Sequence, residues 1–389
     1  MTARDDARDD ARDDARGAWP AADGDAPAWS CLRGVRIVDA GQLLPGPHAC
    51  ALLRQLGADV IKVEPPGGDA LRQFGDDTFA QFNRGKRSIV LDLKTPDGRA
   101  RFLDLVRDAD AVVEGNRPGV MARLGLGYDV LAKANPRVVL CSITGYGQDG
   151  PYANRPGHDL NFLADAGYWS VPAQLHDTVS RPRVRLADHA AALHAALALA
   201  VAVMSARASG LGQHLDVSIH DAIFAWTAPA AWALRTGRDT RDTARWVMPD
   251  NDLFETADGR HVVLATLEDK FWAAFADALG DAYPALREPR FAQRAGRQQH
   301  RHALGALLRA TFATRTQDDW MRVLGALGLP VSRVPDAGAV FDDPHVRARG
   351  VAREVAADRS LAVRFPVKFS LGLPDGDDRV PAPGEYGGR

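Results

Sequence analysis

The sequence predicts an α/β protein with a doubly wound, mostly parallel sheet of Rossmann-like type and a second, smaller α+β domain. Three observations carry this prediction. Short β-branched runs alternate with helical stretches over the first 225 residues, one helix carries clear capping residues, and the pattern changes after a polar, Arg-rich stretch. Strands that alternate with helices build parallel sheets, because the crossover helices cover the faces of the sheet. The 389-residue length suits two unequal domains.

The strands of the sheet are expected at β-branched runs bounded by turn residues. These runs are residues 35–39, 59–64, 88–93, 111–114 and 138–143.

The helices between the strands are marked by caps and apolar stripes. A helix over residues 48–56 follows the first strand, after a Gly/Pro turn. The clearest helix starts after Thr95, a good N-cap, with Pro96 in its first turn and a buried stripe that includes Phe102. The Ala-rich run 190–206 falls slightly short of a membrane span and contains a histidine, so we expect a helix buried against other helices and no membrane association.

The remaining chain divides into a tail, a linker and a small domain. Residues 3–16 repeat Ala-Arg-Asp-Asp without an apolar face, so a disordered tail is expected there. A β-hairpin over residues 252–267 opens the small domain and is followed by helices. The expected divisions are 1–30 for the tail, 31–225 with 335–389 for the large domain, 226–249 for the linker and 250–334 for the small domain.

Composition excludes several classes of function. A formal net charge of -2 gives no support for binding nucleic acid or an acidic membrane. The three cysteines form no CxxC pair and the eleven histidines form no HExxH motif, so neither a disulfide scaffold nor a metal site is expected. No apolar stretch follows a basic start, so no signal peptide is expected, and we expect a cytoplasmic protein.

The turn after the first strand does not match a nucleotide-binding motif. A Rossmann dinucleotide site needs G-x-G-x-x-G at this place, but residues 41–47 have another glycine spacing and two prolines. No GxxxxGK[ST] motif occurs either. The sequence therefore predicts no permanently bound cofactor.

Several blocks, in order, resemble the class III CoA-transferase family, which includes carnitine dehydratase, bile-acid-inducible protein F and the α-methylacyl-CoA racemases. The resemblance is strongest over about residues 30 to 225. The blocks are Pro45-Gly46-Pro47 with residues 56–69, then 83–88, 116–120, and 145–152 running into Gly157-His158-Asp159. This resemblance implies acyl-CoA and carboxylic acids as partners, with coenzyme A as a moiety of the substrate. It also implies an interlocked homodimer.

Asp159 is the first candidate catalytic residue. Its position before an apolar run is typical of a helix N-cap, and a helix N-terminus favours an ionised carboxylate. The resemblance implies that Asp159 attacks an acyl-CoA thioester and forms a mixed anhydride. The CoA thiolate then returns to give an aspartyl-CoA thioester, from which an acceptor acid takes the CoA.

An acyl-CoA racemase or epimerase is the alternative function. In the racemases of this family, a histidine at the place of His158 and an aspartate at the place of Asp188 exchange the α-proton of the substrate from opposite sides. Asp188 also suits the N-cap of the Ala-rich helix, and His189-Ala190-Ala191 replaces the glycine-rich run of the racemases. A non-catalytic CoA-binding relative is the third alternative.

Basic residues are expected to bind the CoA phosphates and adenine, because the planar guanidinium of arginine makes paired hydrogen bonds to phosphate. The resemblance places seven residues at the CoA site: Pro45, Gly46, Arg72, Lys86, Arg87, Arg123 and Tyr152.

Overall fold

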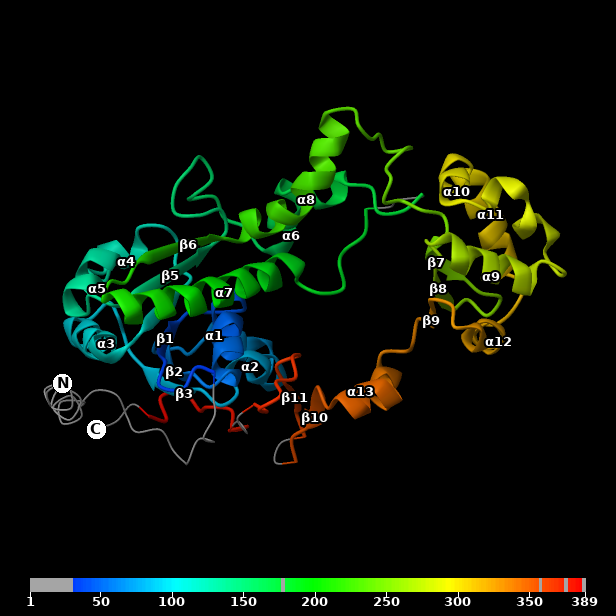
Figure 1. Ribbon diagram of the computed structural model, residues 1–389. Coiled ribbons are helices and arrows are strands. Elements are labelled where there is room, and N and C mark those ends of the chain that lie inside the picture. The colour runs from blue at the N-terminus through cyan, green and yellow to red at the C-terminus, as the bar shows by residue number, and fades with distance from the viewer. Residues whose placement is uncertain (1–30, 176–178, 357–358, 374–376, 387–389) are drawn as a thin grey trace, which may run out of the picture. The chain divides into compact units, whose positions relative to one another are not determined.

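The computed structural model describes residues 31–175, 179–356, 359–373 and 377–386, so the expected tail lies outside the described residues (Figure 1). The chain divides into two compact units. The first unit comprises Met1–Ala166, Pro182–Ala225 and His345–Arg389, and the second comprises Gly167–Arg181 and Trp226–Pro344.

The first unit is built on a six-stranded sheet in the order β3-β2-β1-β4-β5-β6, and every neighbouring pair is parallel. This is the doubly wound topology that the sequence predicts. The strands are β1 (Arg36–Ala40), β2 (Asp59–Glu64), β3 (Arg87–Val90), β4 (Ala111–Glu114), β5 (Val139–Thr144) and β6 (His214–Ser218).

Strand β6 was not predicted, for a physical reason. It lies at the edge of the sheet, and its residues alternate between exposed and partly buried positions. Three of its five side chains are polar, and the run lacks the apolar character of the central strands.

Helices cover the sheet and supply its core. Thr95 caps α3 by accepting the N–H of Gly98 at 3.0 Å, as predicted. Phe102 of α3 is fully buried in one cluster with Val38 and Val112 of the sheet. The helices are α1 (Pro45–Gln55), α2 (Asp76–Asn83), α3 (Pro96–Asp108), α4 (Val120–Arg123), α5 (Tyr128–Ala134), α6 (Asp159–Asp165) and α7 (Leu186–Ser209).

The long helix α7 packs along α1 (Figure 1). Among the described residues it is the one helix that is long and apolar enough to cross a membrane, and half of that apolar window is buried within the protein. Its buried residues include Ala191, Ala195, Leu199 and Ala202, which lie at helical spacing on one face. The run is therefore a core helix on this face, as predicted from the sequence.

The second unit has a core of its own. The predicted hairpin is present, and a third strand pairs antiparallel with it. Trp272, Phe275, Phe312 and Trp320 fill the space between this sheet and the helices. The elements are β7 (Asn251–Glu255), β8 (His261–Ala265), β9 (Val331–Arg333), α9 (Asp269–Leu279), α10 (Arg294–Gln299), α11 (Arg301–Phe312) and α12 (Gln317–Leu324).

Two connections differ from the sequence prediction. Helix α8 (Ile219–Arg235) runs into residues 226–235, which were expected to open a linker. Its apolar residues extend the helix from the first unit into the second, even with Pro229 inside it. The second unit extends to Pro344, about ten residues beyond the expected boundary, where helix α13 (Pro344–Arg349) begins.

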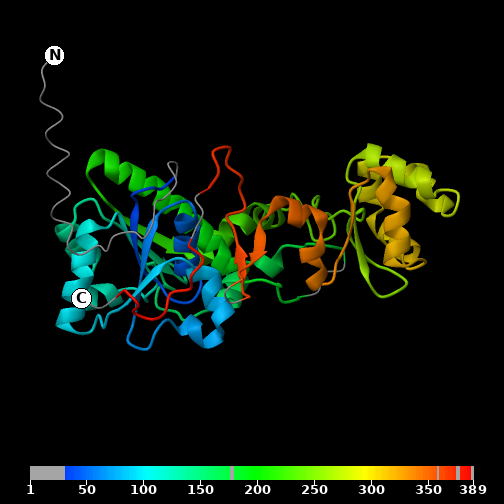
Figure 2. The same cartoon turned by 90° about the horizontal axis from the view of Figure 1, so that it is seen from below.

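The C-terminal segment returns to the first unit (Figure 2). It contains the antiparallel pair β10 (Ala352–Glu354) and β11 (Leu361–Val363). The N–H of Tyr386 then donates to the carbonyl of Ser88 at 3.0 Å, and the N–H of Gly85 donates to the carbonyl of Arg379 at 2.7 Å. The segment thereby covers edge strand β3, which would otherwise expose unpaired backbone groups.

Candidate active site

Asp159 lies where two helices begin. It is the first residue of α6 and is only 8% exposed. Its Oδ1 accepts the backbone N–H of Ala187 at 2.8 Å and that of Asp188 at 3.2 Å, both in the first turn of α7. These N–H groups have no partner within their own helix, and the positive end of the α7 dipole favours an ionised carboxylate.

The predicted cap roles of the two aspartates are therefore wrong in detail. His158, and not Asp159, stands at the N-cap of α6, where its N–H donates to Asn161 at 3.0 Å. Arg185, and not Asp188, stands at the N-cap of α7. Asp159 instead caps α7 from a distant part of the sequence, an arrangement that local sequence cannot show.

A single aromatic ring positions α6. The loop between β5 and α6 starts at Gly145 and ends at Gly157, and both glycines lie against the ring of Phe162. A Cβ atom at either glycine would come within 2.7 Å of that ring. The glycines therefore allow the loop to close tightly around Phe162, and this closure sets the position of Asp159 one turn earlier.

Asp188 interacts with Asp159 through charge. Burial and then the charge of Asp159 raise the pKa of Asp188 to about 7, while Arg185 acts in the opposite direction. Two close carboxylates resist ionising together, so Asp188 keeps a proton near neutral pH. His158 is exposed and is not among the groups that shift the pKa of Asp188. The structure thus brings together Asp159 and Asp188.

The turn between β1 and α1 is compact and strained. Gly46 packs against Gly41, with 3.2 Å between the position of an added Cβ and the Cα of Gly41, and Pro45 opens α1 directly before it. Leu43 has a φ of 61°, a conformation that costs energy in a residue with a Cβ. Its N–H donates to Asp69 at 3.1 Å, which holds the turn in this shape.

A buried network of charges supports this turn. Lys62 donates to the carbonyl of Gly41 at 2.9 Å and pairs with Asp69 at 2.7 Å. Lys86 donates to Asp39 at 2.7 Å and to the carbonyl of Pro47 at 2.8 Å. Burial alone would raise the pKa of Asp39, but the two lysines lower it below its ordinary value. Sequence reasoning missed this network, although charged residues inside apolar strands were its visible signal.

Three of the predicted phosphate-binding residues have internal partners. Lys86 is only 3% exposed and belongs to the network just described. Arg72 makes two hydrogen bonds to Glu64, at 2.7 and 2.8 Å, and a third to the carbonyl of Pro381. Arg87 pairs with Asp59 and is 6% exposed. Lys86 and Arg72 thus balance buried carboxylates, and Arg87 balances the partly exposed Asp59.

Glu64 explains why Arg72 is held so firmly. Burial opposes its ionisation, but hydrogen bonds from Arg72 and Ser88 lower the pKa of Glu64 to about 2. Glu64 is therefore charged over the whole neutral range, and the guanidinium of Arg72 stays beside it. The ring of Phe79 lies 3.6 Å below that guanidinium.

Arg123 and Tyr152 remain accessible. Arg123 ends the short helix α4, beyond the carboxyl end of β4, and its side chain is exposed. Ligands of doubly wound folds collect at this end of the strands. Tyr152 is half exposed in the loop that precedes Asp159, and the guanidinium of Arg155 lies 5.0 Å from its ring.

A pair of histidines lies beside the site and was not singled out from the sequence. The Nδ1 atoms of His48 and His189 are 3.1 Å apart. Among the residues that the structure describes, no group of three His, Cys, Asp or Glu side chains is arranged to hold a metal ion.

Comparisons with known proteins show the family of this chain. The model for "CoA-transferase family III" matches residues 32–385. An acyl-CoA transferase of Fusarium pseudograminearum is 34% identical over 355 residues, which cover 85% of this chain and 76% of that protein. The β subunit of succinyl-CoA–L-malate CoA-transferase from Chloroflexus aurantiacus is 32% identical over 332 residues, which cover 82% of each chain.

The fold also matches a solved structure. The crystal structure of a CaiB/BaiF family protein from Brucella suis superposes with a TM-score of 0.80 at 30% identity, covering 92% of this chain and 97% of that one. The family match spans nearly the whole described chain and includes both units. The chain is therefore an enzyme of CoA-transferase family III, the CaiB/BaiF family.

Proposed function

We propose that this enzyme transfers CoA from an acyl-CoA to a free carboxylic acid through a covalent intermediate on Asp159. The observation that carries the proposal is the buried carboxylate of Asp159, held at the N-terminus of α7 by two backbone N–H groups. Both bonds reach Oδ1, and we assign Oδ2 to the attack on the substrate. The fixed carboxylate needs little reorganisation before it reacts.

The proposed reaction balances without a proton donor. Oδ2 of Asp159 attacks the thioester carbonyl, the C–S bond breaks, and CoA leaves as a thiolate. The thiolate attacks the Asp159 carbonyl of the anhydride, which releases the first carboxylate and leaves an aspartyl-CoA thioester. The acceptor carboxylate attacks that thioester and again expels the thiolate. The thiolate then attacks the new acyl carbonyl, and Asp159 is regenerated.

The substrates that we propose are acyl-CoAs and small carboxylic acids. The relative from Chloroflexus aurantiacus is named for succinyl-CoA and L-malate, which both carry a second carboxylate. Arg123 is our candidate for the CoA phosphates, because it is exposed at the carboxyl end of the sheet. Pro45, Gly46 and Tyr152 are the candidates for contacts with the rest of CoA.

The decisive experiment traps the intermediate. The enzyme is incubated with succinyl-CoA and hydroxylamine, digested, and examined by mass spectrometry. A hydroxamate on Asp159 is the expected result. In a parallel reaction, malyl-CoA should form only when L-malate is added as the acceptor acid. Asp159→Asn should lose transfer by at least about 10³-fold, since it removes the nucleophile. Full activity of Asp159→Asn would contradict the proposal.

Proton exchange at the α-carbon is the second candidate, and one observation favours it. A carboxyl group with a pKa of about 7, as in Asp188, can both accept and return a proton at neutral pH. In deuterated water, deuterium would then enter the α-position of 2-methylacyl-CoA without any acceptor acid, and both His158→Ala and Asp188→Asn would abolish it. Binding of CoA without either reaction would point to a non-catalytic relative.

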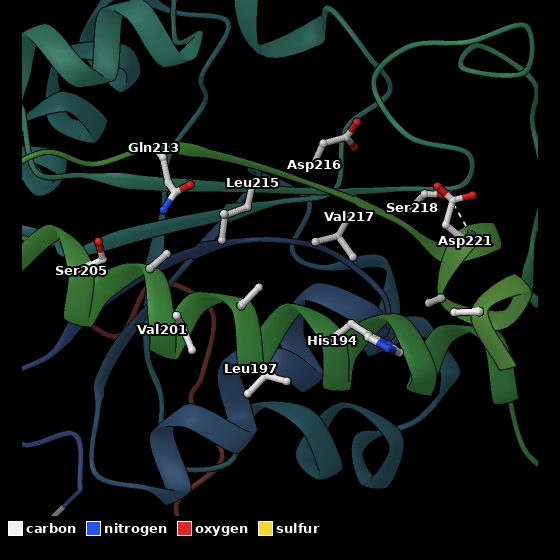
Figure 3. Close-up of a pocket in the computed structure, with 14 residues that line it drawn as sticks. His194, Leu197, Val201, Ser205, Gln213, Leu215, Asp216, Val217, Ser218 and Asp221 are labelled. Carbon is white, nitrogen blue, oxygen red and sulfur yellow. Dashed lines mark hydrogen bonds between the residues drawn. The ribbon is translucent and has the colours of Figure 1, made fainter.

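We also propose that the enzyme is a homodimer. The face of α7 that does not pack on α1 exposes Leu193, Leu197, Val201 and Met204, each at least 51% accessible. A cavity of about 710 Å³ lies between this helix and β6, and Leu197 and Val201 line it together with Leu215 (Figure 3). An apolar stripe of this length on a soluble enzyme is typical of a subunit interface.

A reducing compartment, the cytoplasm, is the location that we propose. Cys31, Cys50 and Cys141 are all free thiols, and burial raises the pKa of Cys50 and of Cys141. Buried neutral thiols are unreactive, so they behave as small apolar side chains in the core.

A further inference from the structure

Two imidazole rings meet beside the proposed nucleophile. His48 lies in the first turn of α1, and His189 lies in the first turn of α7, 141 residues later. Their Nδ1 atoms are 3.1 Å apart, and the ring centroids are 4.9 Å apart in an edge-to-face arrangement. One ring must donate and the other must accept, so the pair requires complementary tautomers.

The surroundings keep both rings neutral. Burial, then the charges of His189 and Lys86, lower the pKa of His48 to about 4. Burial also lowers the pKa of His189, with Arg185 acting in the same direction and Asp159 opposing it. Phe82 of α2 packs against both rings, with centroids 5.2 and 6.1 Å away. The hydrogen bond between neutral rings therefore persists across the neutral range.

The pair joins the two segments that build the active site. On one side, His189 directly follows Asp188, whose N–H donates to Asp159. On the other side, His48 directly follows Pro47, whose carbonyl accepts a hydrogen bond from the buried Lys86. The histidine contact is thus a direct side-chain link between the first turn of α7 and the first turn of α1, next to the turn over residues 41–47.

We propose that the His48–His189 hydrogen bond is a positioning element that holds the α7 N-terminus, and with it the carboxylate of Asp159, in register with the turn over residues 41–47. The inference rests on the proposed function. Neither histidine is assigned contact with the substrate. A displacement of about 1 Å at a reacting group can cost about 10²-fold in rate, which is the scale of effect expected when the link is lost.

The test compares two amides at one position. Asn places its amide near the position of Nδ1, whereas Gln places its amide near the position of Nε2. His48→Asn should therefore keep the link, and His48→Gln should lose it, although the two side chains have similar polarity. With succinyl-CoA and L-malate, we expect kcat to fall about 10²-fold in His48→Gln and only a few-fold in His48→Asn. The KM for succinyl-CoA should change little in both.

A second substitution tests whether the two rings act as one unit. His189→Gln should lower kcat as much as His48→Gln does, and the double variant should be no slower than either single variant. His302→Gln, exposed on α11 of the second unit, is the matched control and should leave kcat unchanged.

Three outcomes contradict the inference in different ways. Equal kcat in His48→Asn and His48→Gln would show that the Nδ1 link is not used. A lower melting temperature with unchanged kcat in His48→Gln and His189→Gln would show that the pair stabilises the fold but does not position Asp159. A wild-type enzyme that transfers no CoA would contradict the proposed function itself, and the positioning role with it.

Discussion

Two carboxylates share the N-terminus of α7, and their surroundings give them different properties. Asp159 accepts backbone hydrogen bonds there, while Asp188 is partly buried beside it and has its pKa raised to about 7. A helix terminus can stabilise one negative charge well, but a second charge in the same place is repelled. The second carboxyl group therefore titrates in the physiological range.

Asp188 makes stability depend on pH. Below about pH 4 the folded and unfolded chains both hold its proton. Between pH 4 and 7 the folded protein keeps a proton that the unfolded chain has released, so the free energy of unfolding falls as pH rises. A rise of the Asp188 pKa from 3.8 to about 7 corresponds to a loss of at most about 4 kcal/mol in the free energy of unfolding. Asp188→Asn removes this cost.

Urea unfolding at pH 5 and pH 8 measures the effect. The wild-type enzyme should lose stability between these values relative to Asp188→Asn, and at pH 8 the variant should be the more stable of the two. Parallel pH profiles for the two proteins would show that Asp188 is ionised throughout, against the raised pKa.

At the scale of the element, α6 carries the proposed nucleophile on a short helix whose Phe162 ring packs against the preceding loop. Seven residues give little helical stability of their own, so tertiary contacts must hold the helix in place. Gly145 and Gly157 both lie against Phe162 and leave no room for a side chain.

Gly157→Ala should move this element. Its Cβ would lie 2.7 Å from the ring of Phe162, so the ring or the loop must shift, at a cost of about 1–3 kcal/mol. We expect kcat to fall together with stability, because Asp159 begins the same helix. Gly325→Ala is the control, since an added Cβ there meets nothing within 4 Å. Thermal unfolding and steady-state kinetics of both variants measure these effects. An unchanged kcat in Gly157→Ala would show that the loop does not position Asp159 for the reaction.

At the scale of the whole molecule, the exposed stripe of α7 predicts self-association. A glutamate at Leu197 or Val201 would place a charge in the centre of the apolar face, where burial without a partner is costly. We expect the wild-type enzyme to sediment as a dimer and Leu197→Glu to shift it towards the monomer. Leu211 is an exposed leucine just beyond α7, and Leu211→Glu should leave the molecular mass measured by sedimentation unchanged. Equal masses for wild type and Leu197→Glu would refute the interface.

The sequence predicted the large elements well because their signals are local. Alternating strands and helices gave the parallel sheet, and Thr95 with Pro96 marked the start of α3 to the residue. Edge strand β6 was not predicted because its exposed positions carry polar side chains, as in His214 and Asp216. The extension of α8 past residue 225 was not predicted because the linker was placed by the polar, Arg-rich stretch that follows the helix.

The candidate site was predictable only in part. Motif resemblance singled out Asp159, and the structure holds its carboxylate at the N-terminus of α7. Arg72 and Lys86 were expected to bind the CoA phosphates, but the structure pairs them with groups that lie far along the chain. Lys86 meets Asp39, 47 residues away, and Arg72 meets the carbonyl of Pro381, 309 residues away. No local pattern reveals such pairs.

The sequence by itself determined the alternation of strands and helices, the Thr95 cap, the family and the position of one conspicuous aspartate, since each depends on neighbouring residues or on ordered motifs. Only the tertiary structure decided that Asp159 caps α7, that Asp188 shares its charge environment, and that His48 meets His189. The physical reason is that hydrogen bonds, burial and charge coupling act through space. Their partners become neighbours only when the sheet and its helices have packed.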